Sequence, residues 1–318
     1  MLLSLLLVIV GFASLIFGAN WLVDGASALA KKNKVSDLAI GLTIVALGTS
    51  APELVVNIIS SINGYSDLIL GNIIGSNNFN LFIILGLVGL IAPIKVQSST
   101  AWKEIPISLF ASVLLLFLIN DFQFTGTTYL SRIDGLIMLV LFCLFLFYVF
   151  KQLKSEPIEQ IQVKQKSAVK IWALIIIGLT GLILGGQLVV IHSVNIANEI
   201  GISEKIIGLT IVAVGTSLPE LVTSIVAISK KNSDIAIGNI IGSNIFNILL
   251  IFSISSITNP IEFNSIFNTD LYIMIGGTFL LFIFMKSGKN KVLDPWEAAI
   301  LFGFYVVYTT YLIVKETV

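Results

Sequence analysis

The sequence predicts an all-α polytopic membrane protein, with ten transmembrane helices arranged as two inverted five-helix repeats in which helices 2 and 7 are broken. Three observations predict this fold class. The composition is 56% hydrophobic and only 11% charged over 318 residues, which is far from the usage of soluble domains. Apolar runs fill nearly the whole chain, and two long motifs each occur twice at one fixed spacing.

Ten apolar runs are long enough to be transmembrane helices, because crossing about 30 Å of hydrocarbon takes about 20 helical residues. They start near residues 2, 38, 68, 105, 132, 171, 205, 234, 270 and 296. The first run lacks the basic n-region of a signal peptide and is too long for its apolar segment, so we interpret it as a span. The expected domains are an N-terminal repeat (1–150), a cytoplasmic linker (151–170) and a C-terminal repeat (171–318).

Basic residues predict the orientation. Fifteen of the 18 Lys and Arg fall in loops on the same side as the linker, and cytoplasmic loops carry the excess of basic residues. We therefore expect a protein of the cell (inner) membrane with both termini outside and the linker in the cytoplasm. The tryptophans fall at predicted span ends, as in an aromatic belt: Trp21, Trp102, Trp172 and Trp296.

The two motifs define an internal repeat. Ile40–Leu54 matches Ile207–Leu221 at 13 of 15 positions, with an offset of 167 residues, and Gly71–Asn80 matches Gly238–Asn247 at the same offset. The repeated regions are therefore about 40–80 and about 207–247. Because each half has an odd number of spans, the second half enters the membrane in the opposite orientation. Inverted repeats of this kind are typical of alternating-access transporters.

Glu53 and Glu220 are the charged side chains that we place near the middle of apolar spans, where an ionisable group costs about 2.5–3.5 kcal/mol. Pro52 and Pro219 precede them, and each should break its helix and free backbone carbonyls, including that of Ala46. Carbonyl, hydroxyl and carboxylate oxygens together suit hard cations such as Na⁺ or Ca²⁺. A protonated glutamate at a helix interface is the alternative, but it does not explain two carboxylates at one repeat position.

The second motif adds polar stripes at helical spacing: Asn72, Ser76 and Asn80, repeated as Asn239, Ser243 and Asn247. Polar helix packing is the alternative role, above all for Asn72 and Asn239. Beside the stripes run GxxxG spacings, Gly71 with Gly75 and Gly238 with Gly242, which we expect to let helices approach the broken spans closely.

The composition excludes several other functions. One cysteine, Cys143, and one histidine, His192, argue against zinc, copper or haem, so no cofactor is expected. The net charge is zero and no basic stripe occurs, so nucleic acid is not an expected partner. An intramembrane hydrolase would need a nucleophile with a base or a metal triad, which the sequence lacks. We expect no enzyme and no obligatory protein partner; the lipid bilayer surrounds the chain.

At these residues the chain resembles the Na⁺/Ca²⁺ exchanger family of the cation/Ca²⁺ exchanger superfamily, in particular its compact prokaryotic members. Their two alpha-repeats carry GTS-x-PE and GS-x-x-x-[ND] motifs like those present here. The resemblance implies that the first and sixth spans slide past the remaining bundle and that several Na⁺ exchange for one Ca²⁺, which produces a current. It implies these ion ligands: the carboxylates of Glu53 and Glu220; hydroxyls of Ser50, Ser217, Ser76 and Ser243; oxygens of Thr49 and Thr216; carbonyls of Ala46 and Ala213; and Asn80 and Asn247 at the centre.

The expected function is therefore Na⁺/Ca²⁺ antiport by alternating access, electrogenic and independent of K⁺. The last expectation rests on a departure, because some archaeal members and the K⁺-dependent branch carry aspartate where this chain has Asn80 or Asn247. An H⁺/Ca²⁺ or other divalent-cation antiporter at the same site is the alternative, since protons would also neutralise the two glutamates.

Overall fold

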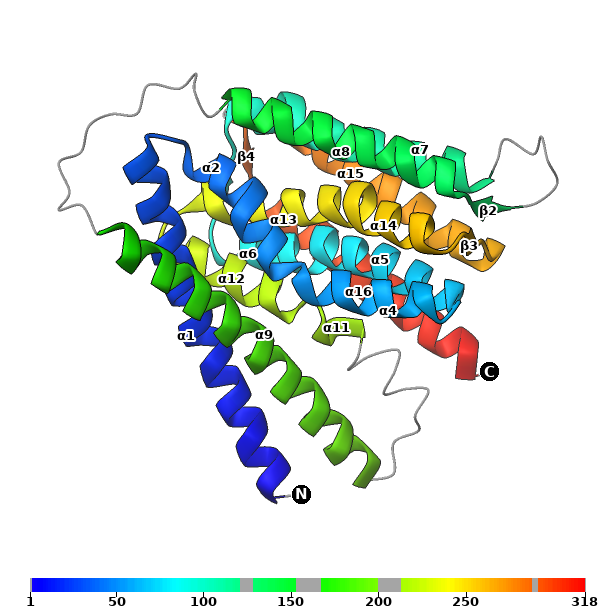
Figure 1. Cartoon of the computed structure of the whole chain (residues 1–318), viewed down its shortest axis with the longest axis horizontal. Helices are drawn as coiled ribbons and strands as arrows, with labels where there is room; N and C mark the ends of the chain where they lie inside the picture. Colours follow the sequence, from blue (N-terminus) through cyan, green and yellow to red (C-terminus); the bar gives the residue numbers. More distant parts are fainter. Residues whose placement is uncertain (1, 121–127, 153–166, 200–212, 288–290, 318) are drawn as a thin grey trace.

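The computed structural model describes residues 2–120, 128–152, 167–199, 213–287 and 291–317, which form a bundle of helices (Figure 1). Most of the expected linker and the first part of the second copy of the long motif, residues 207–212, lie outside the described residues.

Seven helices in the described part of the chain are long and apolar enough to cross a membrane, or eight if the bent pair 37–49 and 51–62 forms one span. The chain is thus an all-helical membrane protein. The ten-span count stays a prediction, because the apolar helix Leu218–Ser229 is short and the residues just before it are not described.

The first half contains five predicted spans and two short strands. Its elements are α1 (Leu2–Asn33), α2 (Asp37–Ile40), η1 (Gly41–Val45), α3 (Ala46–Thr49), α4 (Ala51–Ile62), α5 (Ser66–Asn78), η2 (Phe79–Ile84), α6 (Leu85–Ile91), β1 (Ile94–Lys95), η3 (Thr100–Glu104), α7 (Ile105–Asn120), β2 (Tyr129–Leu130) and α8 (Arg132–Gln152). The segments η1, η2 and η3 are π-helical turns within longer helices.

The second half repeats this order. Its elements are α9 (Ala168–Glu199), α11 (Ala213–Gly215), α12 (Leu218–Ser229), α13 (Ser233–Phe246), the π-helical η6 (Asn247–Ile251), α14 (Phe252–Thr258), β3 (Ile261–Glu262), the 3₁₀ turn η7 (Ser265–Phe267), α15 (Asn268–Ser287), β4 (Val292–Leu293) and α16 (Pro295–Thr317). Two antiparallel strand pairs, β1 with β4 and β2 with β3, join the halves.

The predicted break in helix 2 is confirmed. The helix bends by 48° between Thr49 and Ala51, and Ser50 leaves helical geometry at φ −82° and ψ 6°. Pro52 lies in the first turn of α4, where its missing amide hydrogen has no partner to lose. Ser217 has nearly the same angles, φ −91° and ψ 6°, directly before α12. Each break therefore starts a new helix just before a glutamate.

The centre of the bundle is formed by α13–α14 and α5–α6, whose apolar windows are 94% and 78% buried, against 28–39% for the other spans. Close helix approach is confirmed for α13. A Cβ atom on Gly238 would lie 2.8 Å from the Leu38 carbonyl oxygen, and one on Gly242 2.8 Å from the Ala46 Cβ. For Gly75 the expectation stays a prediction, because the equivalents of the residues that Gly242 meets, Leu209 and the side chain of Ala213, lie outside the described part.

Helices α1 and α9 lie side by side and run obliquely to the rest of the bundle (Figure 1). Their contact is a seam of glycines in which backbone meets backbone. A Cβ on Gly18 would lie 2.8 Å from the Gly178 carbonyl oxygen, and one on Gly185 would lie 2.8 Å from that of Gly11. At the centre of the seam, the Ser14 hydroxyl donates to the Gly181 carbonyl oxygen at 2.8 Å. The two helices therefore pack as one unit.

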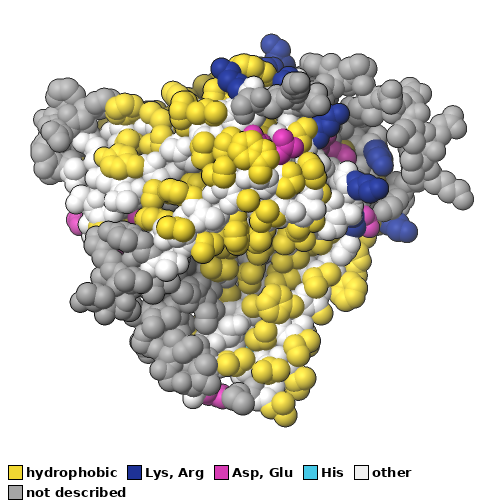
Figure 2. Space-filling view, turned by 180° about the vertical axis from the view of Figure 1, so that it is seen from behind, with side chains coloured by type: hydrophobic (Ala, Val, Ile, Leu, Met, Phe, Trp, Pro, Cys, Tyr) yellow, Lys and Arg dark blue, Asp and Glu magenta, His cyan; other side chains and the backbone are white. Residues whose placement is uncertain are grey.

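The outer surface is apolar, as a lipid-facing surface must be. Hydrophobic side chains cover the middle of the face in Figure 2, while Lys and Arg gather toward one end. Large exposed apolar residues come from α1, α8, α9, α15 and α16 among others, for example Phe17 on α1 and Phe147 on α8. This distribution agrees with a bundle surrounded by lipid and with one basic end.

Candidate cation site

The two glutamates lie in the first turns of α4 and α12, fully buried, with Glu53 0% and Glu220 1% exposed. The hydroxyl of Ser50, in the break of one half, donates to Glu220 Oε1 at 2.9 Å. The hydroxyl of Ser217, in the break of the other half, donates to Glu53 Oε1 at 3.4 Å. Each broken helix therefore holds the carboxylate of its repeat partner, and the start of each new helix favours the negative charge.

Threonine and asparagine side chains brace the same region across the repeat. Thr49 Oγ1 donates to Asn239 Oδ1 at 3.0 Å, and Asn72 Nδ2 donates to Thr216 Oγ1 at 3.4 Å. These two contacts are repeat equivalents, because both residue types recur at an offset of 167. Asn72 and Asn239 thus bond to protein groups, which favours a bracing role over an ion-contacting one for this pair.

Among the buried oxygens that have no hydrogen-bond partner in the described part of the chain, six form three repeat-related pairs. They are Glu53 Oε2, Glu220 Oε2, Ser76 Oγ, Ser243 Oγ, Asn80 Oδ1 and Asn247 Oδ1. Burying an acceptor without a donor costs about 1–3 kcal/mol, and a carboxylate costs more. A bound cation would offset that cost at each of these atoms that it contacts.

Packing brings these groups together. Helix α12, which carries Glu220, contacts η2, which begins just before Asn80, and α4, which carries Glu53, contacts η6, which begins at Asn247. The two carboxylates are close enough to repel each other when charged.

Donor chemistry decides which ions fit. The described residues hold no group of three or more His, Cys, Asp or Glu side chains that could bind a metal. The candidate site instead combines two carboxylates with hydroxyl and amide oxygens. Hard cations such as Na⁺ and Ca²⁺ prefer that mixture.

The Ala46 carbonyl differs from expectation. We expected the break to free it, but it accepts hydrogen bonds from the Ser50 amide at 3.0 Å and from Thr49 Oγ1 at 3.3 Å. The reason is that the chain leaves helical geometry only at Ser50, so the Ser50 amide still donates to the carbonyl four residues earlier. Ala213 begins α11, and its side chain lies outside the described part.

Two pairs of residues near the site were not singled out from the sequence. Asn57 Nδ2 donates to the Glu53 carbonyl oxygen at 2.6 Å, and its repeat equivalent Ser224 accepts from Asn239 Nδ2 at 3.0 Å. Asn77 and Asn244 accept from Asn247 and Asn80 across the repeat. For Asn77 and Asn244 the sequence contained a signal: each directly follows a serine of the polar stripes, Ser76 or Ser243, and the asparagine is the same in both copies of the motif.

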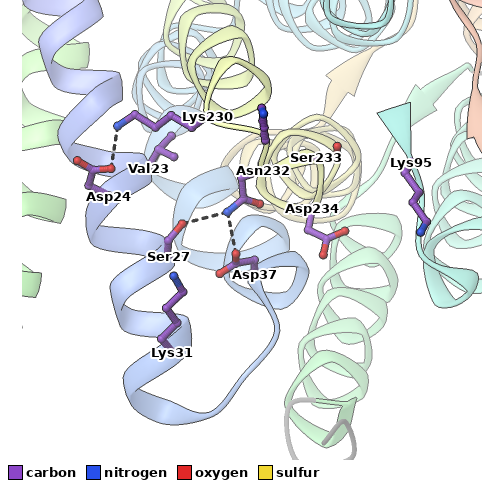
Figure 3. A pocket seen from close by; sticks show the side chains of 11 residues that line it. Val23, Asp24, Ser27, Lys31, Asp37, Lys95, Lys230, Asn232, Ser233 and Asp234 are labelled. Atoms are coloured by element: carbon purple, nitrogen blue, oxygen red, sulfur yellow. Dashed lines mark hydrogen bonds and ion pairs between the residues drawn. The ribbon is translucent and has the colours of Figure 1, made fainter. Parts of the chain in front are cut away.

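A second polar group lies at the basic end and holds α1 against the turn between α12 and α13 (Figure 3). We name it the α1 anchor cluster; it comprises Asp24, Ser27, Asp37, Lys230 and Asn232. Lys230 Nζ lies 2.8 Å from Asp24 Oδ1. Asn232 Nδ2 donates to Ser27 Oγ at 3.0 Å and to Asp37 Oδ2 at 2.7 Å. The cluster lines a cavity of about 500 Å³.

At the opposite end, four of the five members of this cluster are replaced by other residue types, and the equivalent of Asp37, Glu204, lies outside the described residues. Ile191 and Val194 occupy the positions equivalent to Asp24 and Ser27, and Asn63 and Tyr65 those equivalent to Lys230 and Asn232. The side chain of Asn63 bonds within its own helix, to the Ile59 carbonyl oxygen. The structure is therefore symmetric at the candidate cation site and asymmetric at its two ends.

Comparison with known proteins identifies the family of the chain. A family model described as "Sodium/calcium exchanger protein" matches residues 3–151 and 170–314. The sodium/calcium exchanger MaX1 of Methanosarcina acetivorans is 31% identical, over 97% of this chain and 98% of its own. The inner membrane protein YrbG of Escherichia coli (strain K12) is 35% identical, over 86% of each chain.

Among solved structures, the sodium-calcium exchanger NCX_Mj soaked with Na⁺ and Sr²⁺ superimposes with a TM-score of 0.84 and 31% sequence identity. The match covers 96% of this chain and 97% of that one. Motifs, fold and whole-length similarity agree, and the chain belongs to the sodium/calcium exchanger family.

Proposed function

We propose that this protein is a secondary active antiporter that exchanges Na⁺ for Ca²⁺ across the inner membrane by alternating access. The observation that carries the proposal is the reciprocal pairing of Ser50 with Glu220 and of Ser217 with Glu53 around buried, unpartnered carboxylate oxygens. The names of MaX1 and NCX_Mj support the ion pair, and the name of YrbG supports the membrane.

Charge explains why one site can exchange two ions. Two carboxylates are neutralised by one Ca²⁺ or by two Na⁺, so the site does not hold both loads at once. A third Na⁺ would make the Na⁺-loaded protein positive and the exchange electrogenic. Asn80 and Asn247 add no charge where K⁺-dependent relatives carry aspartate, which supports exchange without K⁺.

The proposed ligand set follows from the same geometry. Its members are Glu53, Glu220, Ser50, Ser217, Ser76, Ser243, Thr49, Thr216, Asn80 and Asn247, with the carbonyls of Ala46 and Ala213 for outlying Na⁺. For Ala46 the proposal requires that its carbonyl exchange a hydrogen bond for the ion, because both lone pairs are engaged.

The proposed architecture is ten transmembrane helices in two inverted repeats, 1–150 and 171–318, joined by a cytoplasmic linker, 151–170, with both termini outside. Two hydrogen bonds that the 167-residue offset relates to each other, Thr49 with Asn239 and Thr216 with Asn72, support the inverted repeat. The excess of Lys and Arg on one side supports the orientation. In this arrangement the α1–α9 unit moves relative to the remaining bundle and opens the site to one side at a time.

Proton-coupled Ca²⁺ exchange at the same site is the second candidate. The observation that favours it is that Glu53 Oε2 and Glu220 Oε2 are buried without a partner, so either can take up a proton. Two protons would neutralise the pair as two Na⁺ would.

Transport by the purified protein in liposomes separates these functions. Vesicles loaded with Na⁺ are diluted into Na⁺-free buffer with trace radioactive Ca²⁺, at equal pH on both sides and with choline in place of K⁺. We expect Ca²⁺ uptake that requires internal Na⁺, charges the membrane, and falls to background in Glu220→Gln. Glu262→Gln is the matched control, since Glu262 is an exposed glutamate on β3.

Each other outcome has a defined meaning. Uptake that ignores Na⁺ but follows an imposed pH gradient would assign the protein to proton-coupled exchange. Uptake that persists in Glu220→Gln would remove the paired carboxylates from the transport site.

A further inference from the structure

The position of Asn80 does not by itself determine which side of its side-chain amide faces the candidate cation site. An amide side chain has an oxygen on one side and an NH₂ group on the other, and only the oxygen can face a cation. Asn80 is 0% exposed and lies at the start of η2, so no water fixes its orientation from outside. A neighbouring group must decide which side meets the ion.

The hydrogen bonds of Asn244 determine the orientation of the Asn80 amide. Asn244 Nδ2 donates to the backbone carbonyl oxygen of Asn77 at 3.4 Å. A backbone carbonyl only accepts, so the amide nitrogen of Asn244 must lie on that side and its oxygen on the other. That oxygen accepts from Asn80 Nδ2 at 3.0 Å. The Asn80 NH₂ group is thereby engaged, and its Oδ1 is the atom left without a partner.

Asn247, the repeat equivalent of Asn80, also has its NH₂ group engaged and its oxygen unpartnered. Asn247 Nδ2 donates to Asn77 Oδ1 at 3.2 Å, and Asn247 Oδ1 has no partner. Asn77 Nδ2 is unpartnered, so no backbone carbonyl fixes Asn77 as one fixes Asn244. The orientation is therefore determined more firmly at Asn80 than at Asn247.

We propose that Asn244 is a positioning residue of the transport site, which turns the carbonyl oxygen of Asn80 toward the transported cation and keeps the NH₂ group away from it. The inference rests on the proposed function, because it assumes that a cation occupies the site between the glutamates. Asn244 does not contact the ion in this proposal. It acts through Asn80, from α13 of one half to η2 of the other.

The test uses a substitution that makes orientation irrelevant. Asn244→Leu removes the acceptor, and we expect the apparent affinity for Ca²⁺ to fall about 10- to 100-fold, the usual effect of losing a group that orients a ligand. Asn80→Asp carries an oxygen on both sides of the side chain. In the Asn80→Asp background, Asn244→Leu should change the Ca²⁺ affinity less than about threefold, because either orientation offers an oxygen. The maximal exchange rate should change less than the KM.

Radioactive Ca²⁺ binding to the four purified proteins in detergent, with exchange in liposomes beside it, gives the result. Equal losses of affinity in both backgrounds would overturn the proposal and assign Asn244 a packing role; no loss in either would overturn it too. Asn78→Leu is the matched control, since Asn78 is a buried asparagine next to Asn77 whose Nδ2 bonds to the Asp270 carbonyl oxygen instead. If the wild type exchanges Ca²⁺ for protons, the proposed Na⁺ coupling is wrong. The proposal for Asn244 is still tested in that case, because Ca²⁺ binding does not depend on the coupling ion. A wild type that binds no Ca²⁺ would refute both.

Discussion

At the scale of single residues, the site depends on hydroxyl groups that each serve the other half of the molecule. Ser50 lies in the break of helix 2 but donates to Glu220, and Ser217 lies in the second break but donates to Glu53. Ser50 and Ser217 precede α4 and α12 but make no side-chain hydrogen bond to the backbone of those helices, so their hydroxyls are free to cross the interface. The hydrogen bonding of the glutamate in each half therefore depends on the backbone geometry at the break in the other half.

Ser50→Ala tests this dependence. It leaves Glu220 Oε1 buried without its donor, which costs about 1–3 kcal/mol, so we expect the apparent affinity for Ca²⁺ to fall roughly tenfold. Ser50→Thr keeps a hydroxyl and should retain most of the affinity. The measurement is the KM for Ca²⁺ in Na⁺-loaded liposomes. Ser229→Ala is the control, since its hydroxyl bonds within its own helix, and an equal effect there would contradict the assignment.

At the scale of helices, the α1–α9 seam has no space for side chains at its glycines. In Gly178→Ala, the new Cβ would lie 2.6 Å from the Leu22 amide nitrogen and 2.8 Å from the Gly18 carbonyl oxygen. Backbone must shift to make room, so we expect a loss of about 1–3 kcal/mol in stability. Thermal unfolding in detergent measures it.

Gly303→Ala serves as the control for that substitution. Gly303 lies inside α16 and has nothing within 4 Å among the described residues, so the added methyl group meets no obstacle. Alanine also favours the helix over glycine by about 1 kcal/mol. We expect unchanged or higher stability, and equal losses in the two variants would contradict a close-packed seam.

The features that could be predicted from the sequence are those that a local motif or the internal repeat determines. Proline after a Gly-Thr-Ser run predicts a broken helix, and the break lies at Ser50 as expected. A fixed offset predicts that Glu53 and Glu220 share one environment, and they do. What the sequence could not predict depends on tertiary contact. The two-residue strands are too short to show alternation, and the role of Asn244 depends on a carbonyl that only folding brings near.

At the scale of the whole molecule, the two ends differ although the centre is symmetric. The α1 anchor cluster ties α1 to the α12–α13 turn at the basic end, and its Lys230–Asp24 and Asn232–Ser27 contacts have no counterpart at the other end, where Ile191 and Val194 replace Asp24 and Ser27. In the proposed transport cycle, the α1–α9 unit must leave this contact before the basic end can open. The cluster should therefore stabilise the conformation that is closed at that end.

Asn232→Ala tests the cluster. It leaves Ser27 and Asp37 without their shared donor, so the closed state loses stability and the population shifts toward opening at the basic end. We expect the KM for Ca²⁺ to fall at that face and to rise at the opposite face, about threefold each, measured in vesicles of known orientation. Equal changes at both faces would contradict it. Asn259→Ala is the control, an asparagine at the other end bonded to the Ser61 carbonyl oxygen.

The bond between Ser14 and Gly181 bears on how such a chain arose. The two residues are 167 apart, so each is the repeat counterpart of the other, and a position that meets its own counterpart lies on the axis relating the halves. In an ancestral pair of identical subunits, that position would have faced a copy of itself. The acceptor is a backbone carbonyl oxygen, which every residue carries, so this bond does not depend on which side chain the accepting residue has. The contact could therefore already have formed in such a pair, with the serine of either subunit as the donor and the backbone of the other as the acceptor.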